Sequence, residues 1–167
     1  MKKLIVWVLM VLFPALVYGE NQVDQIAQYD EWYVYKITDE FTDESYLSIF
    51  TMVDGIFFRM TNDSIKLGGF DRFMLVGEVS VIYRVDDNKA SENIPWNRVS
   101  LGTGCFWYGA DEFYWNMVEQ CMAGNEIKFR MTDYGTRFGT VKFPLRGFTK
   151  AFQHINPEYF EKEPTQD

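Results

Sequence analysis

The chain carries few side chains suited to nucleophilic or metal chemistry: one histidine, His154, and two cysteines, Cys105 and Cys121. A serine nucleophile needs a base within hydrogen-bonding reach, and no Gly-x-Ser-x-Gly elbow occurs in the sequence to present one. A zinc finger or a multi-histidine centre needs more ligands than these three side chains provide. We therefore expect no catalytic residue, no bound metal and no cofactor, and we expect that the protein is not an enzyme.

Carboxylates are the remaining candidates for acid–base or cation chemistry. Asp39, Glu40, Asp43 and Glu44 lie close together beside a predicted strand, where a solvated turn is the usual arrangement and a weak cation site is the alternative. The segment 86–91 begins like a calcium loop, but alanine stands at its third ligand position and serine replaces the glycine at its sixth. We expect no calcium site there.

Residues 1–19 are predicted to be a signal peptide. Lys2 and Lys3 precede an apolar run over 4–17, and a cleavage position follows between Gly19 and Glu20. The run is shorter than the roughly 20 apolar residues that span a bilayer, which argues against the alternative of an uncleaved anchor. We expect a periplasmic or secreted protein with no stable membrane span after cleavage.

The charge balance excludes one class of partner. The formal net charge is −8, and removing residues 1–19 takes away two lysines and no acids, which makes it −10. A nucleic-acid-binding protein needs a basic surface to displace counterions from phosphates. We therefore expect no nucleic-acid partner.

Export changes the interpretation of Cys105 and Cys121, which lie sixteen positions apart with no other cysteine to pair with. Disulfides persist in oxidising compartments, so a bridge between these two residues is the first hypothesis. Closing a loop of this length contributes about 3 kcal/mol in the chain-entropy model. Two buried free thiols, or one reactive thiol, are the alternatives.

Most of the remaining pattern is typical of strands. Apolar runs on either side of Asp54-Gly55 predict a hairpin with a two-residue turn over 46–60, because both turn positions favour positive φ. Strict alternation predicts a long strand over 73–85, and a second hairpin is predicted over 127–145. The polar residues 20–30 are expected to form a loose lead-in or a short helical turn.

Two helices interrupt the strands. Residues 111–123 place Tyr114, Met117 and Cys121 on one stripe, with Asp111 as the N-cap. Residues 148–155 show the same spacing in a short closing helix. We expect one strand-rich domain over 31–155, mainly β, built as a curved antiparallel sheet or a small β-sandwich, with a polar tail over 156–167.

Aromatic residues are the only compositional excess, at 18% of the chain. A group near the inserted helix contains more rings than one strand face can bury, so some should be exposed. Core packing explains most of them, and an aromatic surface for a protein or glycan partner is the functional alternative. The members of this candidate surface are Phe106, Trp107, Tyr108, Phe113 and Trp115.

The order of several short motifs resembles a group of small exported bacterial proteins. The chain runs from Trp32 through a Thr-Asp turn at 42–43, a Tyr-Arg-x-Asp strand end at 83–86, and a Phe-x-Leu-x-Gly strand end at 143–147. This resembles, over roughly residues 31–153, the periplasmic proteins of the VasI type, which are associated with type VI secretion, and their prophage-encoded look-alikes. The resemblance implies a strand-rich periplasmic accessory or binding protein without established catalysis.

Tyr83, Arg84 and Asp86 are the positions of the strand-end motif that the resemblance singles out. Their structural interpretation is an arginine at a strand end that pairs with a nearby acid. The sequence as a whole predicts an exported accessory protein that acts by protein or glycan interaction. The alternatives are an inhibitor of a secreted or cell-wall-directed enzyme, with a protruding loop at 109–110 or 133–138, and a carboxylate-dependent hydrolase.

Overall fold

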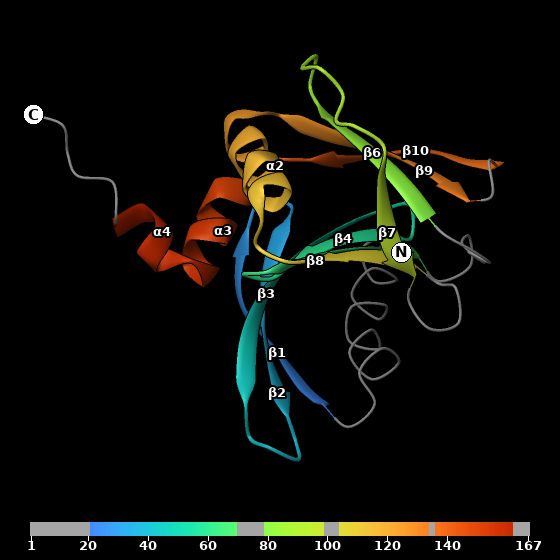
Figure 1. Cartoon of the computed structure of the whole chain (residues 1–167). Helices are drawn as coiled ribbons and strands as arrows, with labels where there is room; N and C mark the ends of the chain where they lie inside the picture. The colour runs from blue at the N-terminus through green and yellow to red at the C-terminus, as the bar shows by residue number, and fades with distance from the viewer. Residues whose placement is uncertain (1–20, 70–78, 99–103, 134–135, 162–167) are drawn as a thin grey trace, which may run out of the picture.

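The structure is a computed structural model that describes residues 21–69, 79–98, 104–133 and 136–161 (Figure 1). Its first strands are β1 (Asn21–Tyr29), β2 (Trp32–Asp39), β3 (Ser45–Val53), β4 (Ile56–Met60) and β5 (Ser64–Gly69). The later strands are β6 (Val79–Val85), β7 (Ile94–Arg98), β8 (Gly104–Tyr108), β9 (Glu126–Asp133) and β10 (Thr136–Pro144). The helices are α2 (Glu112–Ala123), α3 (Phe148–Ile155) and α4 (Pro157–Glu161). The predicted signal peptide, residues 1–19, lies outside the described part.

The described strands form one open sheet of ten strands, in the order β1-β2-β3-β4-β5-β8-β7-β6-β9-β10, and each neighbouring pair is antiparallel. This confirms the predicted strand-rich fold with a curved antiparallel sheet, an inserted helix and a short helix near the C-terminus. The Asp54-Gly55 turn is also confirmed, with φ of 51° and 78° at its two residues.

The sheet curls so that its two ends face each other across the core. Phe58 of β4 contacts Phe129 of β9 and Phe143 of β10, with ring centroids 5.0 and 5.5 Å apart. Trp32 of β2 donates its indole N–H to the carbonyl oxygen of Pro144 at the end of β10, at 3.0 Å. The Phe58–Phe129 pair is edge-to-face, and pairs of this kind add about 0.5–1.5 kcal/mol beyond the area that they bury.

The two longer helices close the curled sheet as their apolar spacing predicts. Asp111 caps α2 by accepting a hydrogen bond from the backbone N–H of Tyr114 at 3.0 Å. The buried residues of α2 are Tyr114, Met117, Val118 and Cys121. The buried residues of α3 are Phe148, Ala151, Phe152 and Ile155, and this helix contacts β1, β2 and β3.

Two terminal segments differ from their sequence-based expectation. The expected lead-in over 20–30 contains strand β1, which pairs along β2 although its side chains are mostly exposed. Backbone hydrogen bonds to β2 hold this edge strand, and they do not depend on side-chain type. The strand therefore does not need the alternating apolar residues by which a strand is predicted. The expected polar tail begins with helix α4, which opens at Pro157, a residue suited to the first helical position.

Candidate functional site

The two strands of the Asp54-Gly55 hairpin differ in length, and the difference leaves part of β3 unpaired on one side. β3 pairs with β2 from Ser45 to Phe50, but it pairs with β4 only from Ile49 to Val53. β2 and β3 therefore continue beyond β4 as an arm, residues 36–47, which projects from the body (Figure 1). No described strand pairs with β3 over 45–48 on the side of β4.

The register identifies the main-chain groups that face this open side. The two-residue turn makes Val53 and Ile56 a hydrogen-bonded pair, and such pairs recur at every second residue of an antiparallel ladder. Counting back along β3 in steps of two from Val53 reaches Leu47 and Ser45. These two residues direct their N–H and C=O groups to the side where β4 has already ended.

A cavity of about 620 Å³ lies beside this edge. Its walls come from residues 45–47 of β3, Arg59 of β4, the turn 61–64 that joins β4 to β5, and Ile155 at the end of α3. Leu47 and Ile155 are apolar, whereas the turn contributes hydroxyl, amide and carboxylate groups. The cavity therefore offers an apolar wall, a polar wall and open main-chain groups together.

Arg59 gives the cavity a positive charge in a protein of net charge −8. Its guanidinium donates a hydrogen bond to the hydroxyl of Tyr46 at 3.3 Å, and its central carbon lies 5.8 Å from the centroid of that ring. Burial lowers the pKa of Arg59 to about 10, so it remains charged at neutral pH. Lys66 lies opposite Arg59 on β5, and burial together with the charge of Arg59 lowers its pKa.

The polar wall is held by its own hydrogen bonds. The hydroxyl of Thr61 donates to a carboxylate oxygen of Asp63 at 2.9 Å and lies 2.6 Å from the hydroxyl of Ser64. Tyr114 of α2 donates its hydroxyl to the carbonyl oxygen of Thr61. These contacts tie the turn to a buried helix residue and give the wall a defined position.

A second cavity of about 560 Å³ adjoins the first, since Asn62 and Ile155 line both. Trp115 and Tyr159 form its aromatic side and stack with ring centroids 5.0 Å apart and an interplanar angle of 4°. The side-chain nitrogen of Asn156, which also lines this cavity, is buried and makes no hydrogen bond with a described residue. We call the two adjoining cavities the α3 groove.

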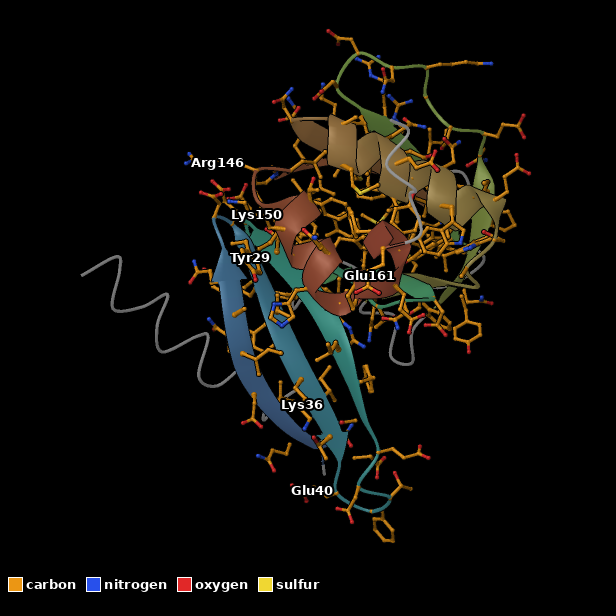
Figure 2. All side chains as sticks on the ribbon, turned by 90° about the vertical axis from the view of Figure 1, so that its left-hand side faces the viewer. Tyr29, Lys36, Glu40, Arg146, Lys150 and Glu161 are labelled. Atoms are coloured by element: carbon orange, nitrogen blue, oxygen red, sulfur yellow. The ribbon has the colours of Figure 1, made fainter. Side chains whose placement is uncertain are left out.

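The tip of the arm presents a single exposed ring. Phe41 is 88% exposed, the highest fraction among the exposed large hydrophobic residues of the described part. Its turn is ordered, because a carboxylate oxygen of Asp39 accepts hydrogen bonds from the backbone N–H groups of Phe41 and Thr42 at 2.8 and 3.1 Å. In Figure 2, Tyr29 lies near α3, Lys36 lies on β2 where the arm begins, and Glu40 lies at the far end of the arm.

The predicted aromatic surface is divided among three places. Trp107 and Phe113 pack together against the core, with ring centroids 4.9 Å apart. Phe106 lies on the opposite face of β8, opposite Lys66, and Tyr108 on the same face is 68% exposed. Trp115 alone lies in the α3 groove. Strand alternation and the turn of α2 separate these neighbouring rings.

The strand-end motif has contacts that hold the fold together. The Tyr83 ring is buried against Phe113 and Phe129. Arg84 pairs with exposed Asp87 at 3.3 Å. Asp86 accepts hydrogen bonds from the backbone N–H groups at 125 and 126, which lowers its pKa and fastens the end of β6 to the start of β9.

The predicted disulfide between Cys105 and Cys121 is wrong, because both are buried free thiols. Cys105 faces β9, and its sulfur lies 4.0 Å from the sulfur of Met131. Cys121 lies in the last turns of α2, where the charge of Asp86 adds to burial in raising its pKa. Burial raises the pKa of Cys105 to about 12. The two side chains thus pack in different parts of the core, and neither is a thiolate at neutral pH.

The one histidine of the chain lies where α3 meets β1. His154 contacts the hydroxyl of Tyr29 through Nδ1 at 3.0 Å and links α3 to β1. Within the described ranges, no three His, Cys, Asp or Glu side chains are grouped closely enough to hold a metal ion. A search of those same ranges for a helix long and apolar enough to cross a membrane finds none.

Comparisons with known proteins find a similar fold in a solved structure and no matching family. No protein-family model matches the chain, and no curated protein matches it. A crystal structure of invasion associated protein B from Bartonella henselae is similar, with a TM-score of 0.57 and 17% sequence identity over 84% of this chain and 98% of that one. At this identity the likeness establishes a shared fold. The resemblance to VasI-type proteins stays a prediction.

Proposed function

We propose that the protein is an exported accessory protein that acts by binding another polypeptide and not by catalysis. The observation that carries this proposal is the arm, which holds Phe41 away from the body in an ordered turn. An exposed apolar ring gains free energy when a partner removes it from water. The acids around it, Asp39, Glu40, Asp43 and Glu44, fit a partner pocket with a basic rim.

Photo-crosslinking from the tip of the arm tests this function. A photoreactive phenylalanine analogue is placed at Phe41 in cells that produce the protein, and the matched control carries it at Glu119, an exposed residue of α2. We expect a discrete adduct of defined mass from position 41 alone. Identical adducts from both positions, or none from position 41, would contradict a binding role for the arm.

The arm also favours the inhibitor alternative, because inhibitors present a rigid protruding segment to their enzyme. The protruding segment is the turn 39–44, and not the predicted loop at 109–110; residues 134–135 of the other predicted loop lie outside the described part. An acidic tip with one exposed ring suits a basic lysozyme-type enzyme. Assays of such enzymes at micromolar protein, with the Phe41→Ala variant as control, distinguish this function: equal inhibition by both proteins, or none, counts against it.

A further inference from the structure

We propose that the open edge of β3, residues 45–48, is a strand-addition site that accepts an extended segment of the partner polypeptide. This deepens the proposed function and rests on it. The segment would continue the path of β4 beyond Met60, antiparallel to β3 and inside the first cavity of the α3 groove. Main-chain hydrogen bonds provide affinity in this binding mode, and side-chain pockets provide selectivity.

The main-chain groups at this edge are arranged for such pairing. The N–H and C=O groups of Ser45 and Leu47 face the cavity, whereas those of Tyr46 and Ser48 face β2. Main-chain groups that no described strand pairs are a ready template for another strand. The 620 Å³ cavity leaves space beside them.

The two outer edges of the sheet are less suitable. β1 has an irregularity in its pairing between Gln25 and Ala27, and β10 has one between Arg137 and Thr140. Bulges at edge strands twist them and discourage pairing with other chains. β3 keeps a regular register from Ser45 to Val53, so the open segment within the sheet is the regular template.

The walls of the cavity indicate the side chains that the segment would carry. Alternate residues of an added strand point to opposite faces of the sheet. On the inner face they would meet Leu47 and Ile155, which suits an apolar residue. On the outer face they would meet Tyr46 and the charged Arg59, which suits a polar or acidic residue. The occupant is therefore an extended segment that alternates apolar and polar residues.

A titration followed by the backbone amide signals of the protein tests the site directly. The probe is a capped peptide of about eight residues that alternates valine with threonine, and the control probe is the same peptide N-methylated at alternate residues. We expect the peptide to shift the Ser45 and Leu47 amide signals and slow their exchange, with a Kd of about 1 mM or tighter. The methylated peptide should have at least about a tenfold weaker effect, since it cannot complete the ladder.

Two variants separate main-chain pairing from other contacts. Ser45→Pro removes one open N–H at the first residue of β3, where proline is tolerated, and Ser45→Ala keeps it. Leu47→Lys places a charge on the edge and provides a second test if the proline variant does not fold. We expect Ser45→Pro and Leu47→Lys to abolish peptide binding and Ser45→Ala to retain it.

Several outcomes would overturn strand addition. One is peptide binding that shifts other residues and leaves Ser45 and Leu47 unchanged. Another is a shift of the groove residues by tri-N-acetylglucosamine and not by peptide, which would assign the groove to a glycan. If position 41 still forms its discrete adduct in the Ser45→Pro variant, the binding function stands and the strand-addition site is rejected.

Discussion

Asp86 shows how one residue joins segments that are far apart in the chain. Its carboxylate accepts hydrogen bonds from the backbone N–H groups of Asn125 and Glu126, at 3.0 and 2.9 Å. These bonds lower its pKa, so the stability that it contributes is present above the unfolded pKa of about 3.9 and is lost as the pH falls through the lower folded value.

We predict that Asp86→Asn lowers the free energy of unfolding at pH 7 by about 1 kcal/mol, because the substitution removes a charge-assisted acceptor. The side chain of Asp87 is fully exposed, so Asp87→Asn serves as the control and should have little effect. Urea denaturation at pH 7 and pH 3 measures both variants. A difference between the Asp86 variant and the parent that persists unchanged at pH 3 would contradict this account of its pKa.

The cysteines give a second prediction at this scale. Burial raises the pKa of Cys105 to about 12 and also raises that of Cys121, so we expect neither thiol to react with iodoacetamide in the folded protein at pH 8. Both should react in urea, and a reducing agent should leave the melting temperature unchanged. A mass two hydrogens below the reduced value, with a melting temperature that falls on reduction, would show that the disulfide forms and would contradict this prediction.

The sequence predicts which residues are buried better than it predicts which residues contact one another. The spacing of Tyr114, Met117 and Cys121 predicts the buried side of α2 correctly, because helical periodicity is local. Met131 belongs to β9, whereas the neighbours of β8 in the sheet are β5 and β7, so the contact of Cys105 with Met131 depends on how the sheet curls, and that is a nonlocal property. A pair of cysteines in the sequence therefore suggests a bond that the packing does not make.

At the scale of elements, Gly147 positions α3 against the turn between β1 and β2. It has a φ of 89°, and a Cβ atom there would clash with the carbonyl oxygen of Tyr29. We predict that Gly147→Ala lowers the free energy of unfolding by about 2 kcal/mol or more. Gly55→Ala is the matched control, because Gly55 also has positive φ but lies in open space. Thermal melts that show equal losses for both variants would contradict a role for the close approach.

Several elements are predictable because their signals are local, and the arm is not among them. Asp54-Gly55 indicates its turn, and Asp111 indicates the start of α2. The apolar runs on either side of the turn differ in length, 46–53 against 56–60, and this difference was the available signal for an overhanging β3. β1 had no such signal, since an exposed edge strand is held by backbone pairing.

At the scale of the whole molecule, strand order decides which residues meet. β8 lies between β5 and β7, so residues far apart in sequence are neighbours and the sheet curls until β3 contacts β10. Sequence periodicity carries no information on this order. The α3 groove joins residues of β3, the turn 61–64, α2 and α4, and so it emerges only from the assembled fold.

Amide hydrogen exchange along β3 in the free protein tests the central claim, that the arm offers an open strand edge. Tyr46 and Ser48 bond to β2, whereas Ser45 and Leu47 face the cavity. We predict that the amides of Tyr46 and Ser48 exchange at least about tenfold more slowly than those of Ser45 and Leu47. Equal protection of all four amides would show that this edge is already paired or covered, and would contradict the account.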